Sequence, residues 1–482
     1  MKQKSIKKNA ILNMGTAIGS TLCSVLSLPY VTRVLQPENY GRISYAQSFV
    51  SYFSLIAELG ILAYAMRECA NVRDDRQKYQ KLANEMFTFN MCATLISLAL
   101  SQIVLWTVPG FRSHWILIEI FLVSVIFDTL RVRWLYQSQE DYAYLSLQGL
   151  FSHALVLVLI YIFIKQETDY YKYAVILIMP AVIPGIMNIV RSRKYCKLRF
   201  TLQTNFKEHF YPIVMIFASN VANTIYVFSD TVILGYITGD YAVGLYAVAI
   251  RIYDTTKALL AAAISVTIPR FCYFYNNGHE DEFKKLLGKV TNLIFIICVP
   301  AFIGLIILAK EIVLILFGNS YREGTLALQL LSGALLFAVP AMMLSQSILI
   351  AMKKEKTVFK VTAFGAILNV VLNIILIPRY AQNAAAFTTL LCEFIVLVIY
   401  AFKTQNEWRH NISIKSLLQA MIAGLIMGVI VANVKLLFDN LLITIIVCLI
   451  VGVFSYFGIL LLFRNSMVCE YLHIGLSRIR KR

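Results

Sequence analysis

Long apolar runs, separated by short polar stretches, cover nearly the whole chain. The hydrocarbon core of a bilayer needs roughly 20 helical residues, and most of these runs reach that length. Read with a hydropathy window of about 19 residues, the pattern predicts fourteen transmembrane helices and an all-α polytopic membrane protein. The helices are expected near residues 9–34, 43–66, 82–108, 114–137, 143–164, 170–190, 209–235, 244–268, 287–309, 324–350, 357–377, 383–402, 414–434 and 441–463.

The composition supports a membrane protein. Of the 482 residues, 59% are hydrophobic and only 15% are charged, and the mean hydropathy is +0.70. An ordinary soluble domain is about 25% charged. The first apolar run is too long for the hydrophobic part of a cleavable signal peptide, so we expect it to remain as a helix.

The basic residues predict the orientation, because Lys and Arg of short loops are retained on the cytoplasmic side. If the amino terminus is inside, 33 of the 44 Lys and Arg lie in inner segments and 9 in outer loops. The remaining two, Arg251 and Lys257, lie within a span. We therefore expect a multi-pass protein of the bacterial cytoplasmic membrane with both termini in the cytoplasm. The net charge of +18 indicates orientation and contact with anionic lipid rather than nucleic acid.

Several function classes need residues that this sequence does not contain. The six histidines show no metal-binding spacing, and the nine cysteines form no C-x-x-C pair. No G-x-x-x-x-G-K-[S/T] sequence is present to bind ATP. The longest predicted outer connection, about 310–323, has fourteen residues, which is too short for the acceptor-binding segment of a membrane glycosyltransferase or polymerase. The sequence predicts a transporter that is not an enzyme and binds no cofactor or metal.

Two predicted helices carry polar side chains along one face. At 3.6 residues per turn, each set falls on a single stripe that is unsuited to lipid. The first stripe comprises Asn9, Asn13, Thr16, Ser20, Ser24 and Ser27, and the second comprises Asn220, Asn223, Thr224, Asp230 and Thr231. Such stripes pack helices together, or two in matching positions line a cavity between halves.

The two stripes lie six helices apart, which suggests two six-helix halves in a parallel repeat. Similar turns support the repeat weakly, at Tyr40-Gly41 and Val243-Gly244. We predict an N-terminal lobe over residues 1–205, a C-terminal lobe over 206–405, and two further helices with a basic tail over 406–482.

The sequence RIYDTTK, residues 251–257, places three charges near the middle of the eighth span. Each costs roughly 2.5 to 3.5 kcal/mol at a helix centre. Asp254 is three residues from both Arg251 and Lys257, so it can neutralise only one of them. The remaining positive charge needs a wet cavity and an anionic ligand, or a structural network completed by Glu58 or Asp230.

Other charges within the spans have simpler interpretations. Glu58 has no partner close in sequence and is a candidate for proton or cation coupling, or for pairing with the eighth span. Asp128 and Arg131 are expected to form a local salt bridge. Glu393 lies midway through a span that is expected to be peripheral. Arg33 and Arg42 flank the first outer turn, where they are interpreted as interfacial anchors, with an outer gate as the alternative.

Three stretches carry a resemblance to a known family: NAILNMGTAIGSTLCSVLSLPYVTRVLQPENYGRISYAQSF, FSDTVILGYITGDYAVGLYAVAIRI and the following PRF. Together with the fourteen helices, they resemble the Wzx-type polysaccharide flippases of the multidrug/oligosaccharidyl-lipid/polysaccharide exporter superfamily. The motifs R-V-L-x-P-x-x-Y-G at 33–41 and D-x-V-I-L-G with G-x-Y-A at 230–247 mark the family but not the sugar. The resemblance implies two six-helix lobes in a V-shape with two appended helices. It also implies transfer of an undecaprenyl-pyrophosphate-linked repeat unit from the inner to the outer leaflet.

In the mechanism that this resemblance suggests, cations in a central cavity hold the pyrophosphate, hydroxyl and amide groups meet the glycan, and the lobes alternate access. The expected substrate-binding residues are Arg251, Lys257, Asn13, Thr16, Ser20, Asn220, Asn223 and Thr224. The expected coupling or charge-network residues are Glu58, Asp230 and Asp254. Coupling to an H+ or Na+ gradient is open, and polysaccharide polymerases and other assembly proteins are expected partners.

Two alternatives remain at this stage. A cation-coupled drug exporter of the same superfamily would favour a cavity dominated by carboxylates, and the positive charge of RIYDTTK disfavours it. A membrane polymerase is disfavoured by the short outer loops.

Overall fold

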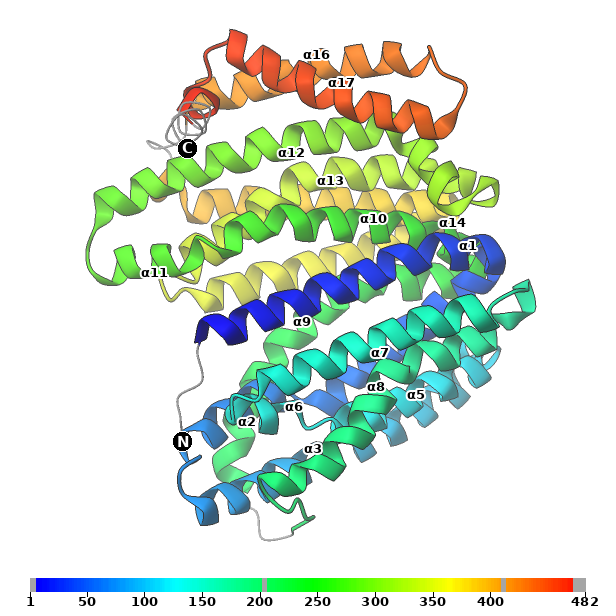
Figure 1. Cartoon of the computed structure of the whole chain (residues 1–482), viewed down its shortest axis with the longest axis vertical. Coiled ribbons are helices and arrows are strands. Elements are labelled where there is room, and N and C mark those ends of the chain that lie inside the picture. Colours follow the sequence, from blue (N-terminus) through cyan, green and yellow to red (C-terminus); the bar gives the residue numbers. More distant parts are fainter. Residues whose placement is uncertain (1–5, 202–205, 409–412, 471–482) are drawn as a thin grey trace. The chain divides into compact units, whose positions relative to one another are not determined.

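The computed structural model describes residues 6–201, 206–408 and 413–470, and every regular element in these ranges is helical (Figure 1). Ten of the helical segments described are long and apolar enough to cross a membrane. The predicted all-α polytopic membrane fold is confirmed. The count of fourteen spans stays a prediction.

The chain divides into two compact units, Met1–Gly244 and Leu245–Arg482. The first contains α1 (Ile6–Glu58), α2 (Ile61–Asn71), α3 (Arg76–Thr107), α4 (Pro109–Arg112), α5 (Trp115–Leu130), α6 (Arg133–Ser138), α7 (Tyr142–Phe163), α8 (Tyr170–Arg191), α9 (Phe206–Thr238) and the start of α10 (Asp240–Ser265). The second contains the rest of α10 and α11 (Ile268–Asn276), α12 (Glu280–Phe317), α13 (Thr325–Met343), α14 (Glu355–Lys403), α15 (Gln405–Trp408), α16 (Ile414–Lys435) and α17 (Leu441–Leu462). The lobe boundaries predicted near residues 205 and 405, and the V-shape, stay predictions.

Two of these helices are too long for one crossing, and each contains a kink. At 1.5 Å per residue, the 53 residues of α1 and the 49 of α14 would extend about 80 and 70 Å, against a hydrocarbon core of about 30 Å. The backbone leaves helical geometry at Gln36 in α1, just before Pro37, and at Ala381 in α14, three residues after Pro378. A residue before proline is driven out of the helical region, which explains the first kink.

The interior of the first unit contains polar side chains that are fully buried. Ser97, Ser101 and Asn188 are fully buried, and the Thr94 hydroxyl lies 2.6 Å from that of Thr129. Large apolar side chains such as Leu95, Ile96 and Ile103 of the same helix α3 are instead exposed. Helices that face lipid gain little from hiding apolar groups, so they associate through small residues and interhelical hydrogen bonds.

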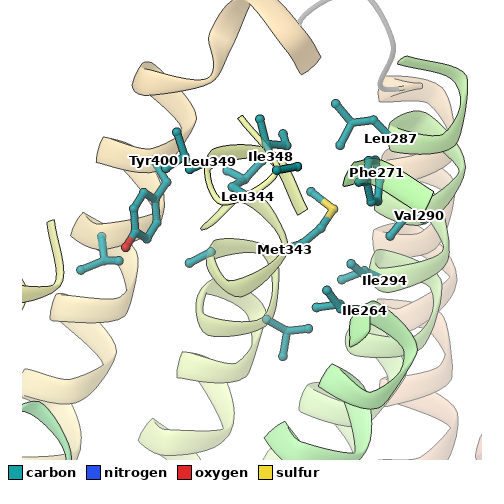
Figure 2. Close-up of a cluster of buried hydrophobic side chains, with 14 of the residues drawn as sticks. Ile264, Phe271, Leu287, Val290, Ile294, Met343, Leu344, Ile348, Leu349 and Tyr400 are labelled. Atoms are coloured by element: carbon teal, nitrogen blue, oxygen red, sulfur yellow. The ribbon is translucent and has the colours of Figure 1, made fainter. Parts of the chain in front are cut away.

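In the second unit, a hydrophobic cluster joins five helices (Figure 2). Ile264 of α10, Phe271 of α11 and Ile294 of α12 meet Met343 of α13 and Tyr400 of α14 there. The cluster fixes the end of α10 that follows the RIYDTTK residues. On the other side of α12, α16 and α17 complete the unit (Figure 1).

Candidate functional site

The charged residues of RIYDTTK lie on α10 and differ in their surroundings. Arg251 and Asp254 are exposed, and Lys257 is partly buried. The Arg251 guanidinium makes no ion pair with a carboxylate in the described part of the chain. A guanidinium in the middle of an apolar helix needs water, a counter-ion or a ligand.

Lys257 belongs to a closed polar triangle within the second unit. Its Nζ atom lies 2.8 Å from Oε1 of Glu393 on α14, and the Tyr253 hydroxyl donates to the same oxygen at 3.1 Å. The Lys257 ammonium also donates to the Tyr253 hydroxyl at 3.2 Å. Tyr253 and Glu393 are 3% and 5% exposed. Within the second unit, the partner of Lys257 is therefore Glu393. The pairing with Glu58 or Asp230 considered from sequence stays a prediction.

This pairing changes the charge expected for the site. The net positive charge predicted from α10 alone is balanced when Glu393 of α14 is included. Arg251 is thus the one cation of RIYDTTK that stays open to an anion, as judged from the described residues.

The polar stripe of α1 is partly a packing surface. Thr16 and Ser20 are half-buried, and Thr16 Cγ2 would lie 3.0 Å from a Cβ atom placed on Gly149 of α7. The Ser24 and Ser27 hydroxyls donate to backbone carbonyls one turn earlier in α1, at 3.1 and 3.2 Å. The side chains of Asn9 and Asn13 lie outside the described part of the structure.

The stripe of α9 divides into an exposed and a buried part. Asn220 and Asn223 are exposed and Thr224 is half-buried. Asp230 is only 4% exposed and lies near Tyr52 of α1. The exposed amides suit contact with a polar ligand, whereas Asp230 belongs to the interior of the first unit.

Glu58 lies at the end of α1 and lines a polar pocket within the first unit. The pocket also contains Asp128 of α5, Arg131, and Arg133 at the start of α6. Arg131 Nη1 lies 2.7 Å from Asp128 Oδ1, which confirms the predicted local salt bridge. Within the first unit, Glu58 makes no hydrogen bond or ion pair with a described side chain.

A second charge cluster forms where α1 resumes after its kink. Asp240, at the start of α10, lies 2.9 Å from His114 Nε2 and 3.4 Å from Arg42 Nε. Arg42 also pairs with Glu38 at 2.6 Å. Arg42 thus links α1 to the start of α10. The interpretation as an interfacial anchor and the alternative of an outer gate both stay predictions.

The glycines of the two turns noted from sequence, Gly41 and Gly244, lie in the same region and have a packing role there. A methyl group on Gly41 would overlap the carbonyl oxygen of Asp240, and one on Gly244 would overlap the carbonyl oxygen of Pro37. Gly41 therefore packs against the backbone of Asp240, and Gly244 packs against the backbone of Pro37. The two turns contact each other at both glycines. This contact needs residues without a Cβ atom.

Two buried polar networks were missed from sequence. On α14, Asn373 donates to Asn369 at 3.0 Å and its side-chain oxygen accepts from Thr388 at 2.6 Å across the kink. In the first unit, His209 of α9 lies 2.8 Å from the Tyr64 hydroxyl and 3.2 Å from Glu85. The four-residue spacing of the two asparagines in an apolar span is a signal that could have identified the first network.

Metal ligands do not gather in the described chain: no group of three or more His, Cys, Asp or Glu side chains there could hold a metal ion. The chemistry that the described sites offer is electrostatic and hydrogen-bonding. They present guanidinium groups, paired carboxylates and amides.

Comparison with known proteins gives consistent matches along the chain. A family model described as "Polysaccharide biosynthesis protein" matches residues 6–274, and one described as "MatE" matches residues 216–375. The chain is 22% identical to the "Putative O-antigen transporter" of Escherichia coli (strain K12), over 84% of this chain and 97% of that protein. It is 24% identical to the "Capsular polysaccharide biosynthesis protein CapF" of Staphylococcus aureus, over 80% and 95% respectively.

Solved structures share the fold at lower identity. The "Lipid II flippase MurJ, inward closed conformation" superposes with a TM-score of 0.79 at 14% identity, covering 95% of this chain and all of that one. An inward-facing multidrug resistance MATE transporter of the MOP superfamily superposes with a TM-score of 0.64 at 16% identity, covering 80% of this chain and 94% of that one. At such identities the likeness establishes the fold alone.

Proposed function

Because the chain belongs to the polysaccharide biosynthesis protein family, we propose that it is a flippase that moves a lipid-linked oligosaccharide across the bacterial cytoplasmic membrane. The substrate is an undecaprenyl-pyrophosphate-linked repeat unit, transferred from the inner to the outer leaflet for assembly of a surface polysaccharide. The observation that carries this proposal within the molecule is Arg251, an exposed guanidinium midway along an apolar helix with no described carboxylate partner.

A pyrophosphate does not enter hydrocarbon unaided, and a guanidinium is well suited to hold it. Arginine binds phosphate oxygens through two parallel charge-assisted hydrogen bonds. Lys257 contributes a second positive charge if its ammonium turns from Glu393 toward the head group. In the first unit, the exposed amides of Asn220 and Asn223 and the half-buried hydroxyls of Thr224 and Ser20 are the candidates to hydrogen-bond the glycan.

The cycle alternates access to the two sides of the membrane while the polyprenyl chain stays in lipid. A gradient of H+ or Na+ drives it through Glu58, Asp230 or Asp254, without ATP and without covalent chemistry. Both termini lie in the cytoplasm, as the distribution of Lys and Arg predicts. A polysaccharide polymerase receives the repeat unit on the outer side.

The test is transfer of a fluorescent polyprenyl-pyrophosphate-linked oligosaccharide in proteoliposomes that contain the purified full-length protein. Replacing Arg251→Gln should lower the initial rate by about tenfold or more, since one bidentate phosphate contact is lost. Arg270→Gln removes the same charge from an exposed position in the short helix α11 and should leave the rate unchanged. Equal rates for the wild-type protein and Arg251→Gln would count against the proposed role of Arg251, and an inactive wild-type protein against the flippase itself.

The MatE match over residues 216–375 favours a second candidate, a cation-coupled exporter of organic cations. Glu393 would then be the acceptor for the drug after Lys257 moves away. Glu393→Gln should abolish drug resistance in cells if the protein is such an exporter. Normal resistance with loss of surface polysaccharide in Arg251→Gln cells supports the flippase instead.

A further inference from the structure

The pocket beside Glu58 is lined by residues with buried hydrogen-bond donors that no described residue satisfies. Trp134 is 2% exposed and lines the pocket, and its indole N–H has no hydrogen-bond partner in the described chain. Arg131 Nε is likewise buried without a described partner, although Nη1 of the same side chain binds Asp128. Buried donors normally have partners, so two unsatisfied donors beside one pocket are candidates to bind an incoming acceptor.

Arg133 adds a whole guanidinium to the same pocket. It is exposed and makes no ion pair or hydrogen bond through its side chain with the described residues. Glu58 and Asp128 lie close enough to influence it, but neither is within ion-pair distance. Its five N–H donors remain available to an incoming acceptor in the described structure.

The backbone between the two arginines is strained. Val132 has φ 36° and ψ 46°, in the left-handed region that β-branched residues avoid. The Val132 side chain is 2% exposed and packs in the cluster around Trp134, which holds this conformation in place. Strain of this kind persists only where the surroundings enforce it, and it is concentrated at binding and active sites. Here the strained residue, Val132, lies between Arg131 and Arg133, whose side chains line one pocket.

We propose that the pocket formed by Arg131, Arg133 and Trp134 is a second phosphate-binding subsite, separate from Arg251 on α10. This deepens the proposed flippase function: the subsite receives the pyrophosphate of the lipid carrier at the end of α1 and α5 before it reaches α10. Guanidinium and indole N–H groups are all donors, and the doubly esterified pyrophosphate of a lipid-linked glycan supplies only acceptors at neutral pH, so the two sets are complementary.

The negative charge of Glu58 in the same pocket makes the subsite testable. The charged groups that face it are Asp128 on α5 and the two arginines, and His153 of α7 lies near Arg131. Asp128 is already paired with Arg131, so Glu58 is the carboxylate that opposes an arriving anion. Removing the charge of Glu58 should therefore strengthen binding, whereas removing that of Arg133 should weaken it.

Isothermal titration of the purified full-length protein in detergent tests the subsite, with inorganic pyrophosphate and geranylgeranyl pyrophosphate as the two probes. The experiment is done in an Arg251→Gln background, so that α10 does not contribute. Arg133→Gln should weaken binding of both probes by about tenfold, Arg133→Lys should weaken it less, and Glu58→Gln should tighten it several-fold. Arg67→Gln is the matched control, because Arg67 is 61% exposed and paired with Glu68, and it should bind like the parent.

Opposite effects of Glu58→Gln and Arg133→Gln cannot arise from a general loss of folding. Equal affinities in the two variants, or losses in both, would overturn the subsite. A response to inorganic pyrophosphate without one to the isoprenyl probe would assign the pocket to free phosphate and overturn its role in the lipid carrier's path. The protein with native Arg251 is tested separately for translocation. If it does not translocate substrate, but Glu58→Gln and Arg133→Gln change binding as expected, the flippase function is wrong and the phosphate-binding subsite is supported.

Discussion

At the scale of single residues, Lys257 and Glu393 stabilise the second unit only as a pair. Glu393 is 5% exposed and its Oε1 atom accepts from both Lys257 and Tyr253. Lys257→Met would leave this carboxylate buried with the Tyr253 hydroxyl alone. Breaking one side of a buried ion pair costs about 3 to 5 kcal/mol, and the partial exposure of Lys257 places the expected loss near the lower value. Thermal unfolding in detergent measures it.

The double variant Lys257→Met/Glu393→Leu supplies the control for this prediction. Replacing both members of a buried pair by apolar side chains is often neutral or stabilising. The double variant should therefore unfold at a higher temperature than Lys257→Met alone. A double variant that unfolds lower still would mean that packing, and not the unpaired charge, dominates at this site.

At the scale of helices, the reciprocal contact of Gly41 and Gly244 sets how closely α1 approaches the start of α10. Gly41→Ala or Gly244→Ala places a methyl group against a backbone carbonyl, which cannot move aside as a flexible side chain can. Overpacking of this kind costs about 1 to 3 kcal/mol. We expect a lower unfolding temperature for each variant and weaker protection of the Asp240 region from hydrogen exchange.

Gly15→Ala on the same helix α1 is the matched control. A Cβ atom at Gly15 would meet nothing within 4 Å, and alanine favours a helix over glycine. This variant should be as stable as the wild-type protein or slightly more so. The close-contact prediction fails if Gly15→Ala and Gly41→Ala lose stability equally.

The start of α3 should depend on pH. Asp75 caps this helix, and its carboxylate accepts from the backbone N–H groups of Lys78 and Gln77 at 3.1 Å. These bonds, the one from Lys78 above all, hold the pKa of Asp75 below its usual value of 3.8. The stabilisation is therefore complete above pH 3.8 and is lost as the pH falls through the lowered folded-state pKa.

Hydrogen exchange measures this loss, after correction for the intrinsic exchange rates. The amides at the start of α3 should lose protection at acid pH, and the loss should be absent in Asp75→Asn, whose side chain still caps but does not titrate. Equal loss of protection in both proteins would show that another group controls the end of this helix.

At the scale of the whole molecule, the all-α membrane fold was predicted correctly because lipid imposes a simple rule on sequence. A span must be apolar over about 20 residues, so long apolar helices follow from hydropathy. The breaks at Leu59-Gly60 and at Val132, inside two predicted spans, do not follow from it. The same rule identified the charges of RIYDTTK as exceptional. The partners of those charges could not be found in this way: Glu393 lies 136 positions from Lys257, and only the packing of α14 on α10 brings them together.

The pocket beside Glu58 illustrates the same limit. Its charges come from the ends of α1 and α5 and the start of α6, and no spacing along the chain predicts that they share a cavity. Conversely, Asp128 and Arg131 are one helical turn apart, and their salt bridge was predicted correctly. Local pairs can be predicted from sequence, whereas a site assembled from several helices requires the fold.

The kink of α14 decides the topology of the second half of the chain and can be tested directly. Between Asn276, the last residue of α11, and Leu437, after α16, the chain passes through α12, α13, α14 and α16. If α14 crosses the membrane twice, on either side of Ala381, the number of crossings is five and the two positions face opposite sides. If it crosses once, the number is four and they face the same side. We expect Leu437→Cys to react with an impermeant maleimide on intact cells and Asn276→Cys to react only after permeabilisation.

Cys196 provides the internal control, with the other native cysteines replaced by alanine. It is 5% exposed, and burial raises the pKa of its thiol to about 12, so the reactive thiolate is scarce at neutral pH. Cys196 should stay unlabelled in the folded protein, in intact and in permeabilised cells, and should react after denaturation. Labelling of both introduced cysteines on intact cells would mean that α14 crosses once, and the kink at Ala381 would then be a bend within one span rather than the turn between two.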